Sequence, residues 1–209
     1  GTAFTLAAKD GANDSLTVLL RYGVNVNYQD DDGSTALHNA AEEGELSTVN
    51  LLLQAGANMN IRSGQDMTPF DLALKRNHRS VLQALIDAGY YVNSRNEDGE
   101  TALHQATKSE KVSLIQMLIT AGANVNVKNN TGVTPLMEAA RSRGTDTTDL
   151  LLGNGANVDE VDRFNLYIIR LLKVAVVDGH ILKASGLKSP RECLGYRLIT
   201  ISFEPIADH

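Results

Sequence analysis

The 209-residue sequence predicts an all-α solenoid in which similar helical units stack side by side. Two residue types carry this prediction, because each recurs every 33 residues along most of the chain. The threonines are Thr2, Thr35, Thr68, Thr101 and Thr134, and the glycines are Gly23, Gly56, Gly89, Gly122 and Gly155. Each unit of such an array buries its apolar face only against its neighbours. We therefore expect function to lie on the outer surface of the stack.

Each recurring residue indicates one part of a helix–helix–turn unit. The threonine hydroxyl can cap the first helix, and Pro69 and Pro135 follow it where a missing backbone N–H costs nothing. Paired alanines such as Ala40-Ala41 let this short helix lie close to the next one. A leucine run such as residues 51–53 then predicts the buried stripe of a second helix. The glycine suits the left-handed position where that helix ends, and an Asn-Val-Asn turn follows.

The local pattern around these residues is specific. In the second unit it consists of Thr35-Ala36-Leu37-His38, Ala40-Ala41, Gly44, Leu51-Leu52-Leu53 and Ala55-Gly56-Ala57-Asn58-Met59-Asn60. This pattern resembles the ankyrin repeat, a 33-residue unit with a Thr-Pro-Leu-His-x-Ala core. The resemblance implies an ankyrin-repeat solenoid of stacked helix-turn-helix units, whose turns project as a row of β-hairpins beside the first helices.

The period defines the domain organisation that we expect. Five repeats cover residues 1–161, over 2–28, 29–61, 62–94, 95–127 and 128–161. Residues 162–185 look like a degenerate sixth repeat, and residues 186–209 form a divergent segment that is a strand, a cap or a tail. The chain does not begin with Met, and its first helix lacks the turn that precedes the later ones, so we expect a fragment of a longer protein.

Repeat three is the irregular one. Asp66 occupies the place of the turn glycine found at Gly33, Gly99 and Gly132. Tyr90-Tyr91 stand where other units have Ala-Asn. The two tyrosines are candidate contact residues, and their alternative interpretation is that one packs beneath the hairpin while the other fills the space left by the lost Ala-Asn.

Composition excludes several classes of function. A formal net charge of −6 disfavours nucleic-acid binding, which requires a clustered basic surface. The single Cys193 cannot form an internal disulfide and is compatible with a reducing compartment. Neither a signal peptide nor a membrane span is apparent in the sequence. We expect a cytoplasmic or nuclear monomer that binds another protein, and neither nucleic acid nor membrane.

The sequence does not predict an enzyme. It contains no Gly-x-Ser-x-Gly, no phosphate-binding Gly-rich loop ending in Lys-Ser or Lys-Thr, and no His-Glu-x-x-His. His38 and His104 occupy the same place in the helix-start motif, and the resemblance implies a hydrogen bond from each to the neighbouring unit. We therefore expect no catalytic residue, cofactor or metal.

The resemblance implies a protein–protein interaction module, either a scaffold or an inhibitory binding domain. In this family the turn tips and the first-helix ends usually contact the partner. The corresponding residues are Asp31, Asp32, Ser34, Glu42, Glu43, Gln65, Met67, Lys75, Arg76, Tyr90, Glu97, Asp98, Glu100, Lys108 and Arg141. Four carboxylates of this set lie in repeat two and four cations lie at later helix ends, so we predict a partner with a basic segment over repeat two and acidic groups beyond it.

Other functions remain as alternatives. One is the substrate-recognition subunit of a ubiquitin ligase, although Ser189 stands where the family's ligase-recruiting box has a Leu, four residues before Cys193. Another is the non-catalytic targeting domain of a larger enzyme. The resemblance also implies possible hydroxylation of the turn asparagines, Asn27, Asn60, Asn93 and Asn126. Their simpler interpretation is structural, because asparagine favours turns by bonding nearby backbone.

Overall fold

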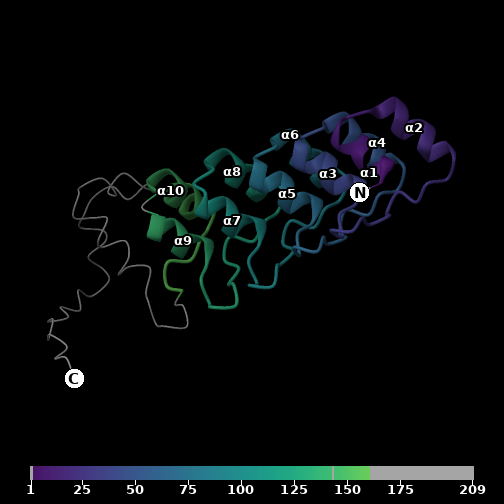
Figure 1. Cartoon of the computed structure of the whole chain (residues 1–209). Coiled ribbons are helices and arrows are strands. Elements are labelled where there is room, and N and C mark those ends of the chain that lie inside the picture. The colour runs from purple at the N-terminus through teal and green to yellow at the C-terminus, as the bar shows by residue number, and fades with distance from the viewer. Residues whose placement is uncertain (1, 143, 161–209) are drawn as a thin grey trace, which may run out of the picture.

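The computed structural model describes residues 2–142 and 144–160, and over these residues it contains ten α-helices and no β-strand. The helices are α1 (Ala3–Lys9), α2 (Asn13–Arg21), α3 (Ala36–Glu43), α4 (Leu46–Gln54), α5 (Pro69–Arg76), α6 (Arg79–Asp87), α7 (Ala102–Lys108), α8 (Val112–Thr120), α9 (Pro135–Ser142) and α10 (Thr145–Gly153). Consecutive helices form five pairs, which stack into one elongated array (Figure 1). This confirms the predicted all-α solenoid. The predicted sixth repeat and the C-terminal segment lie outside the described residues.

The helices lie in two rows, and turns project beside one of them (Figure 1). We call the first helix of each pair, next to the turns, the inner helix, and the second the outer helix. Each turn is closed by its own hydrogen bonds, as where the Gly33 N–H donates to the Asp30 carbonyl over 2.9 Å. The projecting β-hairpins implied by the resemblance are thus present as tight turns, without strands in the described part of the chain.

The recurring threonines begin the inner helices as predicted. Thr68 has an extended backbone, and its hydroxyl oxygen accepts a hydrogen bond from the Asp71 N–H over 3.2 Å. The Asp71 carboxylate in turn accepts from the Thr68 N–H over 2.9 Å. This reciprocal capping box satisfies two backbone donors that a helix start leaves unpaired. Thr2, Thr35 and Thr101 form the same arrangement.

The inner helix ends in the left-handed region of backbone space, where glycine has no steric penalty. Gly44 takes this position in repeat two, with a φ of 82°. Asn77 (φ 64°) and Glu110 (φ 51°) take it in repeats three and four. Asp66, which replaces a turn glycine, also has a positive φ of 57°. Asparagine and aspartate tolerate this region because their short side chains bond locally, whereas glutamate does not share that property.

Glu110 therefore provides a test of stored backbone strain. We expect Glu110→Gly to raise the free energy of unfolding by about 1 kcal/mol, because the glycine removes the Cβ clash at positive φ. Urea unfolding of both proteins measures this difference. The control is Glu110→Ala, which keeps a Cβ and should give no such gain. A lower midpoint for Glu110→Gly would show that the Glu110 side chain contributes more than the strain costs.

One hydrophobic core runs through the array between the two helix rows. Each of the four outer helices from α4 to α10 contributes a leucine with no exposed surface: Leu52, Leu85, Leu118 and Leu151. Inner helices meet them with Leu37, Phe70, Leu103 and Leu136, which are equally buried. The predicted leucine stripe is confirmed, and it holds neighbouring repeats together because each leucine is covered by more than its own unit.

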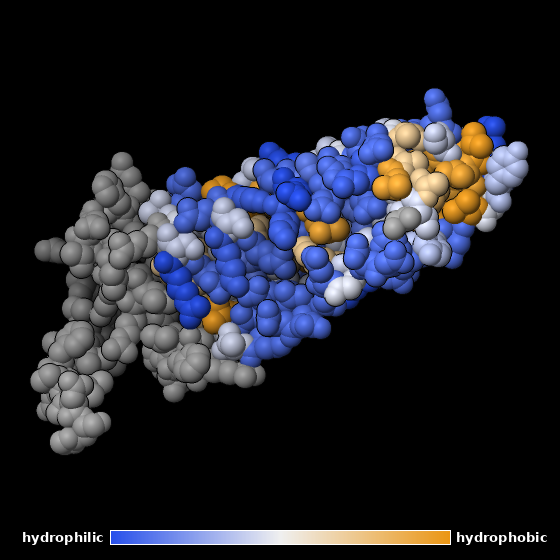
Figure 2. Space-filling view, viewed as in Figure 1, coloured by the Kyte–Doolittle hydropathy of each residue, from blue (hydrophilic) through white to orange (hydrophobic). Residues whose placement is uncertain are grey.

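The N-terminal end of the array differs from its middle. Figure 2 shows apolar surface gathered over α1 and α2, whereas the rest of this face is mostly hydrophilic. Leu6 is 55% exposed and Val18 is 48% exposed. Leu6 corresponds in register to Asn39, whose amide donates to the Thr5 carbonyl of the preceding repeat over 3.1 Å. Leu6 thus lies on the face that meets a preceding repeat in the later units.

Candidate binding surface

The tips of the projecting turns are held in shape by side chains at their base. The Asp30 carboxylate accepts from the backbone N–H groups of Asp32 and Ser34, over 3.1 and 2.9 Å. Asn96 and Asn129 occupy the same place, and each accepts from the N–H four residues later, over 2.8 and 3.0 Å. Such bonds fix a turn without help from a partner. The tips are therefore ordered by their own sequence.

Neighbouring turns are tied together by one side chain per repeat. Gln29 donates to the Arg62 carbonyl over 3.1 Å, and Arg62 donates to the Arg95 carbonyl over the same distance. Arg95 then donates to the Lys128 carbonyl over 2.8 Å. These four residues share one register position, 33 residues apart. The turns thus form a connected row, and this link was not predicted, although the shared spacing of polar residues was visible in the sequence.

Most of the predicted contact residues lie on this row or beside it. Asp31, Asp32, Gln65, Glu97 and Asp98 are exposed at the tips, while Ser34 and Met67 are half-buried at the base of the turns. Glu43, Lys75, Arg76, Lys108 and Arg141 are exposed at the ends of the inner helices. The fold therefore brings residues from four repeats to one side of the molecule.

The predicted separation of charge along this side is not supported by the structure. Arg76 pairs with Glu42 across two repeats over 2.8 Å, and Lys9 lies 3.8 Å from Glu43. Lys108 pairs with Glu100, whose side chain is mostly buried. Arg141 lies 3.8 Å from Glu138. Because Arg76, Lys108 and Arg141 at the helix ends lie beside carboxylates, their charge is largely neutralised, whereas the carboxylates at the turn tips stay exposed.

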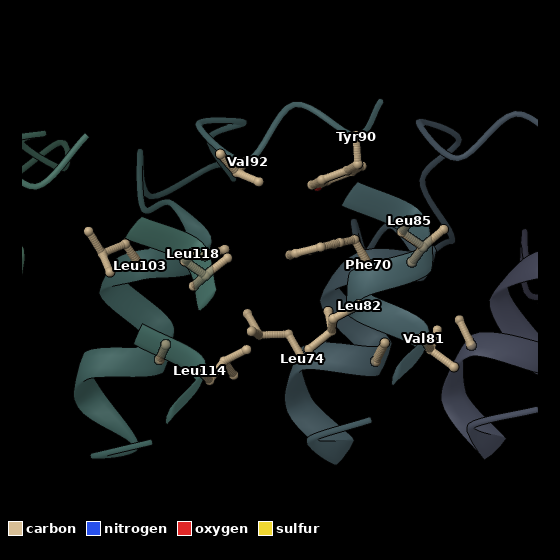
Figure 3. Close-up of a cluster of buried hydrophobic side chains, with 14 of the residues drawn as sticks. Phe70, Leu74, Val81, Leu82, Leu85, Tyr90, Val92, Leu103, Leu114 and Leu118 are labelled. Atoms are coloured by element: carbon tan, nitrogen blue, oxygen red, sulfur yellow. The ribbon is translucent and has the colours of Figure 1, made fainter. Parts of the chain in front are cut away.

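Tyr90 is one of the predicted contact residues, but the structure buries its side chain. Tyr90 is only 7% exposed, and its ring stacks on that of Phe70 with centroids 4.2 Å apart (Figure 3). Its hydroxyl lies 3.3 Å from the Thr68 hydroxyl. At the same position the other repeats carry Val24, Ala57, Ala123 and Ala156, which are all smaller. The adjacent Tyr91 is 65% exposed instead.

The two motif histidines are structural, as predicted. The Thr35 N–H donates to His38 Nδ1 over 3.1 Å, so the proton of the neutral ring lies on Nε2. His38 Nε2 lies 3.0 Å from the Met67 carbonyl of the next repeat and donates to it. His104 makes the same bond to the Val133 carbonyl. Desolvation by burial lowers the pKa of both histidines below 6.5, despite the opposing effect of the backbone hydrogen bonds.

These lowered pKa values predict how stability depends on pH. The unfolded chain protonates His38 and His104 near pH 6.5, whereas the folded chain resists protonation. The unfolded state therefore binds more protons, and stability is complete above pH 6.5 and falls as the pH drops below it. Urea melts at pH 7.5 and 5.5 measure the loss. We expect the loss to shrink in the double variant His38→Gln, His104→Gln, and an equal loss would assign the effect to other groups.

Three of the four turn asparagines join successive repeats. Asn27 accepts from the Asn58 N–H over 2.7 Å. Asn93 accepts from the Asn124 N–H, and its amide donates to the Gly122 carbonyl over 3.0 Å. Asn126 makes both bonds to repeat five. Among the described residues Asn60 makes no equivalent bond to the next repeat, although its own N–H donates to the Asn58 side chain over 2.9 Å. These bonds give three asparagines a structural role, and hydroxylation of all four stays a prediction.

Within residues 2–142 and 144–160, no group of three or more His, Cys, Asp or Glu side chains could hold a metal ion. Over the same part of the chain, every helix is too short or too polar to cross a membrane.

The chain matches a family model of ankyrin repeats in three copies, over residues 1–63 and 70–162. It matches no curated protein. Among solved structures it is similar to an ankyrin repeat domain from Acinetobacter baumannii AYE, with 28% identity, a TM-score of 0.76, and coverage of 82% of this chain and 90% of that one. It is also similar to the ankyrin repeat domain of Bcl-3, a member of the IκB protein family, with 22% identity, a TM-score of 0.78, and coverage of 81% and 77%.

Proposed function

Because this chain belongs to the ankyrin-repeat family, whose repeats are general protein–protein interaction modules, we propose that it binds a partner protein along its projecting turns and inner helices. The observation that carries this proposal is the connected row of turns. Its backbone is fixed by Asp30, Asn96 and Asn129, and its members are joined through Gln29, Arg62 and Arg95. A surface that is ordered before binding loses little conformational entropy when a partner docks.

The chemistry of the tips favours a basic partner segment. Asp31, Asp32, Glu97 and Asp98 are exposed carboxylates on turns that lie in one row. The wall of the hollow between the first two projecting turns includes Asp30 to Asp32 together with Gly64 and Gln65. Complementary charge sets the orientation and the association rate of a complex. We therefore propose that the partner places Lys or Arg residues along the tips, in the manner of a scaffold or an inhibitory domain that covers a basic region.

The proposal is tested by affinity capture from cell lysate followed by mass spectrometry. The test variant changes Asp31, Asp32, Glu97 and Asp98 to Lys. The matched control changes Asp14, Asp87, Asp146 and Asp149 to Lys, which are exposed on outer helices and give the same change in net charge. Circular dichroism verifies that both variants keep their helices.

We expect proteins captured by the parent chain to be retained by the control and lost by the tip variant. The reason is that only the tip variant reverses charge on the proposed surface. Equal loss from both variants would mean that total charge, and not the row of turns, governs binding. Retention by the tip variant would place the binding surface elsewhere.

A further inference from the structure

The junction between repeats three and four differs from every other junction in the described array. Repeat three has Leu74 and Tyr90 at positions where the other four repeats carry smaller residues. At the first position the others have Ala8, Ala41, Thr107 and Ala140, and at the second they have Val24, Ala57, Ala123 and Ala156. Figure 3 shows Leu74 directed toward Leu114 of repeat four, beneath the stacked Phe70 and Tyr90 rings. Larger side chains between close-packed helices push them apart.

Two hydrogen bonds that close the neighbouring junctions are also missing at this one. His38 and His104 each bond a carbonyl of the next repeat, but their counterpart Asp71 has only acceptor atoms and is used locally by Thr68. At the turn tips, the Gly64 N–H donates to the Asp32 carbonyl and the Asn130 N–H to the Asp98 carbonyl. In the described array no backbone–backbone bond joins the tips of repeats three and four, whose turns are linked instead by the Arg62 side chain. Accordingly, α5 and α7 pack less closely than any other two neighbouring inner helices.

The wider spacing leaves a crevice of about 180 Å³ between α5 and α7. Its apolar lining consists of the half-buried Met67 above Leu74, Ala106 and Leu114, which are at most 3% exposed and form its floor. Its charged lining consists of Lys75 and Lys111 without any carboxylate. The Lys111 ammonium donates to the Leu74 carbonyl over 3.2 Å, which places its charge at the C-terminal end of α5. Lys75 is exposed, and within residues 2–142 and 144–160 it makes no ion pair. In a chain with net charge −6, the crevice is thus locally basic.

We propose that this crevice binds an acidic segment of the partner protein, with one leucine-sized side chain inserted between α5 and α7 and flanking carboxylates near Lys75 and Lys111. This inference rests on the proposed protein-binding function and adds a second, chemically distinct subsite to the acidic tips. The apolar walls supply burial of the inserted side chain, and the two ammonium groups supply charge complementarity. The large side chains of Leu74 and Tyr90 thereby hold α5 and α7 apart and create the subsite.

The probe is the acetylated peptide amide Glu-Asp-Leu-Asp-Glu, titrated into the ¹⁵N-labelled full chain and followed by two-dimensional NMR. We expect the amide signals of Gln105, Ala106 and Ser109 to shift and saturate. A peptide with Ser in place of Leu should bind at least about tenfold more weakly, because it loses the apolar burial. The peptide Lys-Lys-Leu-Lys-Lys should leave these signals unchanged.

Variants separate the crevice from general charge effects. Lys75→Glu should weaken binding of the acidic peptide about fivefold, the size expected for one partly exposed ion pair. Its control is Arg79→Glu on α6, an exposed outer-helix change of equal charge that should leave binding unaltered. Both sites are exposed, so neither change should prevent folding.

Several results would overturn the inference. Equal binding of the Leu and Ser peptides, or shifts confined to residues outside the crevice, would do so. A concentration-dependent shift of the same signals without peptide would assign the crevice to a second copy of this chain. A captured partner that binds the Lys75→Glu variant as tightly as the parent would also refute the subsite, while leaving the function proposed for the turns intact.

Discussion

Replacing Phe70 by Ala is expected to lower the free energy of unfolding by about 3–5 kcal/mol, one of the two largest effects that we predict. The Phe70 side chain has no exposed surface, and its ring lies nearly parallel to that of Tyr90, with 7° between the planes. Truncation removes the buried ring, leaves a cavity and takes away the stacking partner of Tyr90. Because the repeats are already widely spaced here, the neighbouring helices are poorly placed to fill that cavity.

The matched control is Phe70→Leu, which introduces the residue found at Leu37, Leu103 and Leu136. This change keeps much of the apolar volume and should cost less than about 1.5 kcal/mol. Urea unfolding followed by circular dichroism gives both values. Similar losses for Phe70→Ala and Phe70→Leu would show that the specific aromatic stack, and not the filled volume, stabilises this junction.

Leu118→Ala is expected to cost about 2–5 kcal/mol, because Leu118 is fully buried on α8 within the core between the helix rows. Glu43→Ala is its surface counterpart. Glu43 is exposed and makes one ion pair, with Lys9, over 3.8 Å, so its loss should cost less than about 1 kcal/mol.

The two measurements together test which positions of the repeat are buried. The same urea unfolding assay applies to both variants. Comparable destabilisation by Glu43→Ala and Leu118→Ala would contradict the assignment of buried and exposed positions. Since the same register defines every repeat, such a result would affect the whole array.

The fold could be predicted from the sequence because the repeated positions have fixed structural roles. Thr35, Leu52 and Gly56 recur at a spacing that identifies a helix cap, a buried stripe and a helix end. Five copies of one signal make the pattern stronger than any single helix prediction. The resemblance implied β-hairpins, but the described residues form tight turns without strands. The turn at Asp30 is closed by its own hydrogen bonds.

The candidate surface was less predictable, because it depends on contacts between repeats. Register placed Tyr90 near a turn, but only the structure shows that its ring fills the space beside Phe70. Likewise, Glu42 and Arg76 are 34 residues apart and appeared as separate charges until the fold paired them. Sequence spacing gives the position of a side chain within its repeat, whereas its partner depends on the neighbouring repeat.

The sequence has Asp71 at the position of His38 and His104, but the consequence of this difference depends on the neighbouring repeat. The missing histidine bond affects the junction between repeats three and four together with two other differences. These are the large Leu74 side chain and the missing backbone bond at the turn tips. Together they create the crevice between α5 and α7. Residues that depart from the repeat pattern should therefore be considered together when they lie at the same interface between two repeats.

The central claim, that the turns and inner helices form the binding surface, is tested most directly by hydrogen–deuterium exchange of the chain with and without a captured partner. We predict slower exchange on binding in residues 30–34, 63–67, 96–100 and 129–133 and in the adjoining inner helices. Exchange in α4, α6 and α8 should change little. Protection confined to those outer helices would contradict the account.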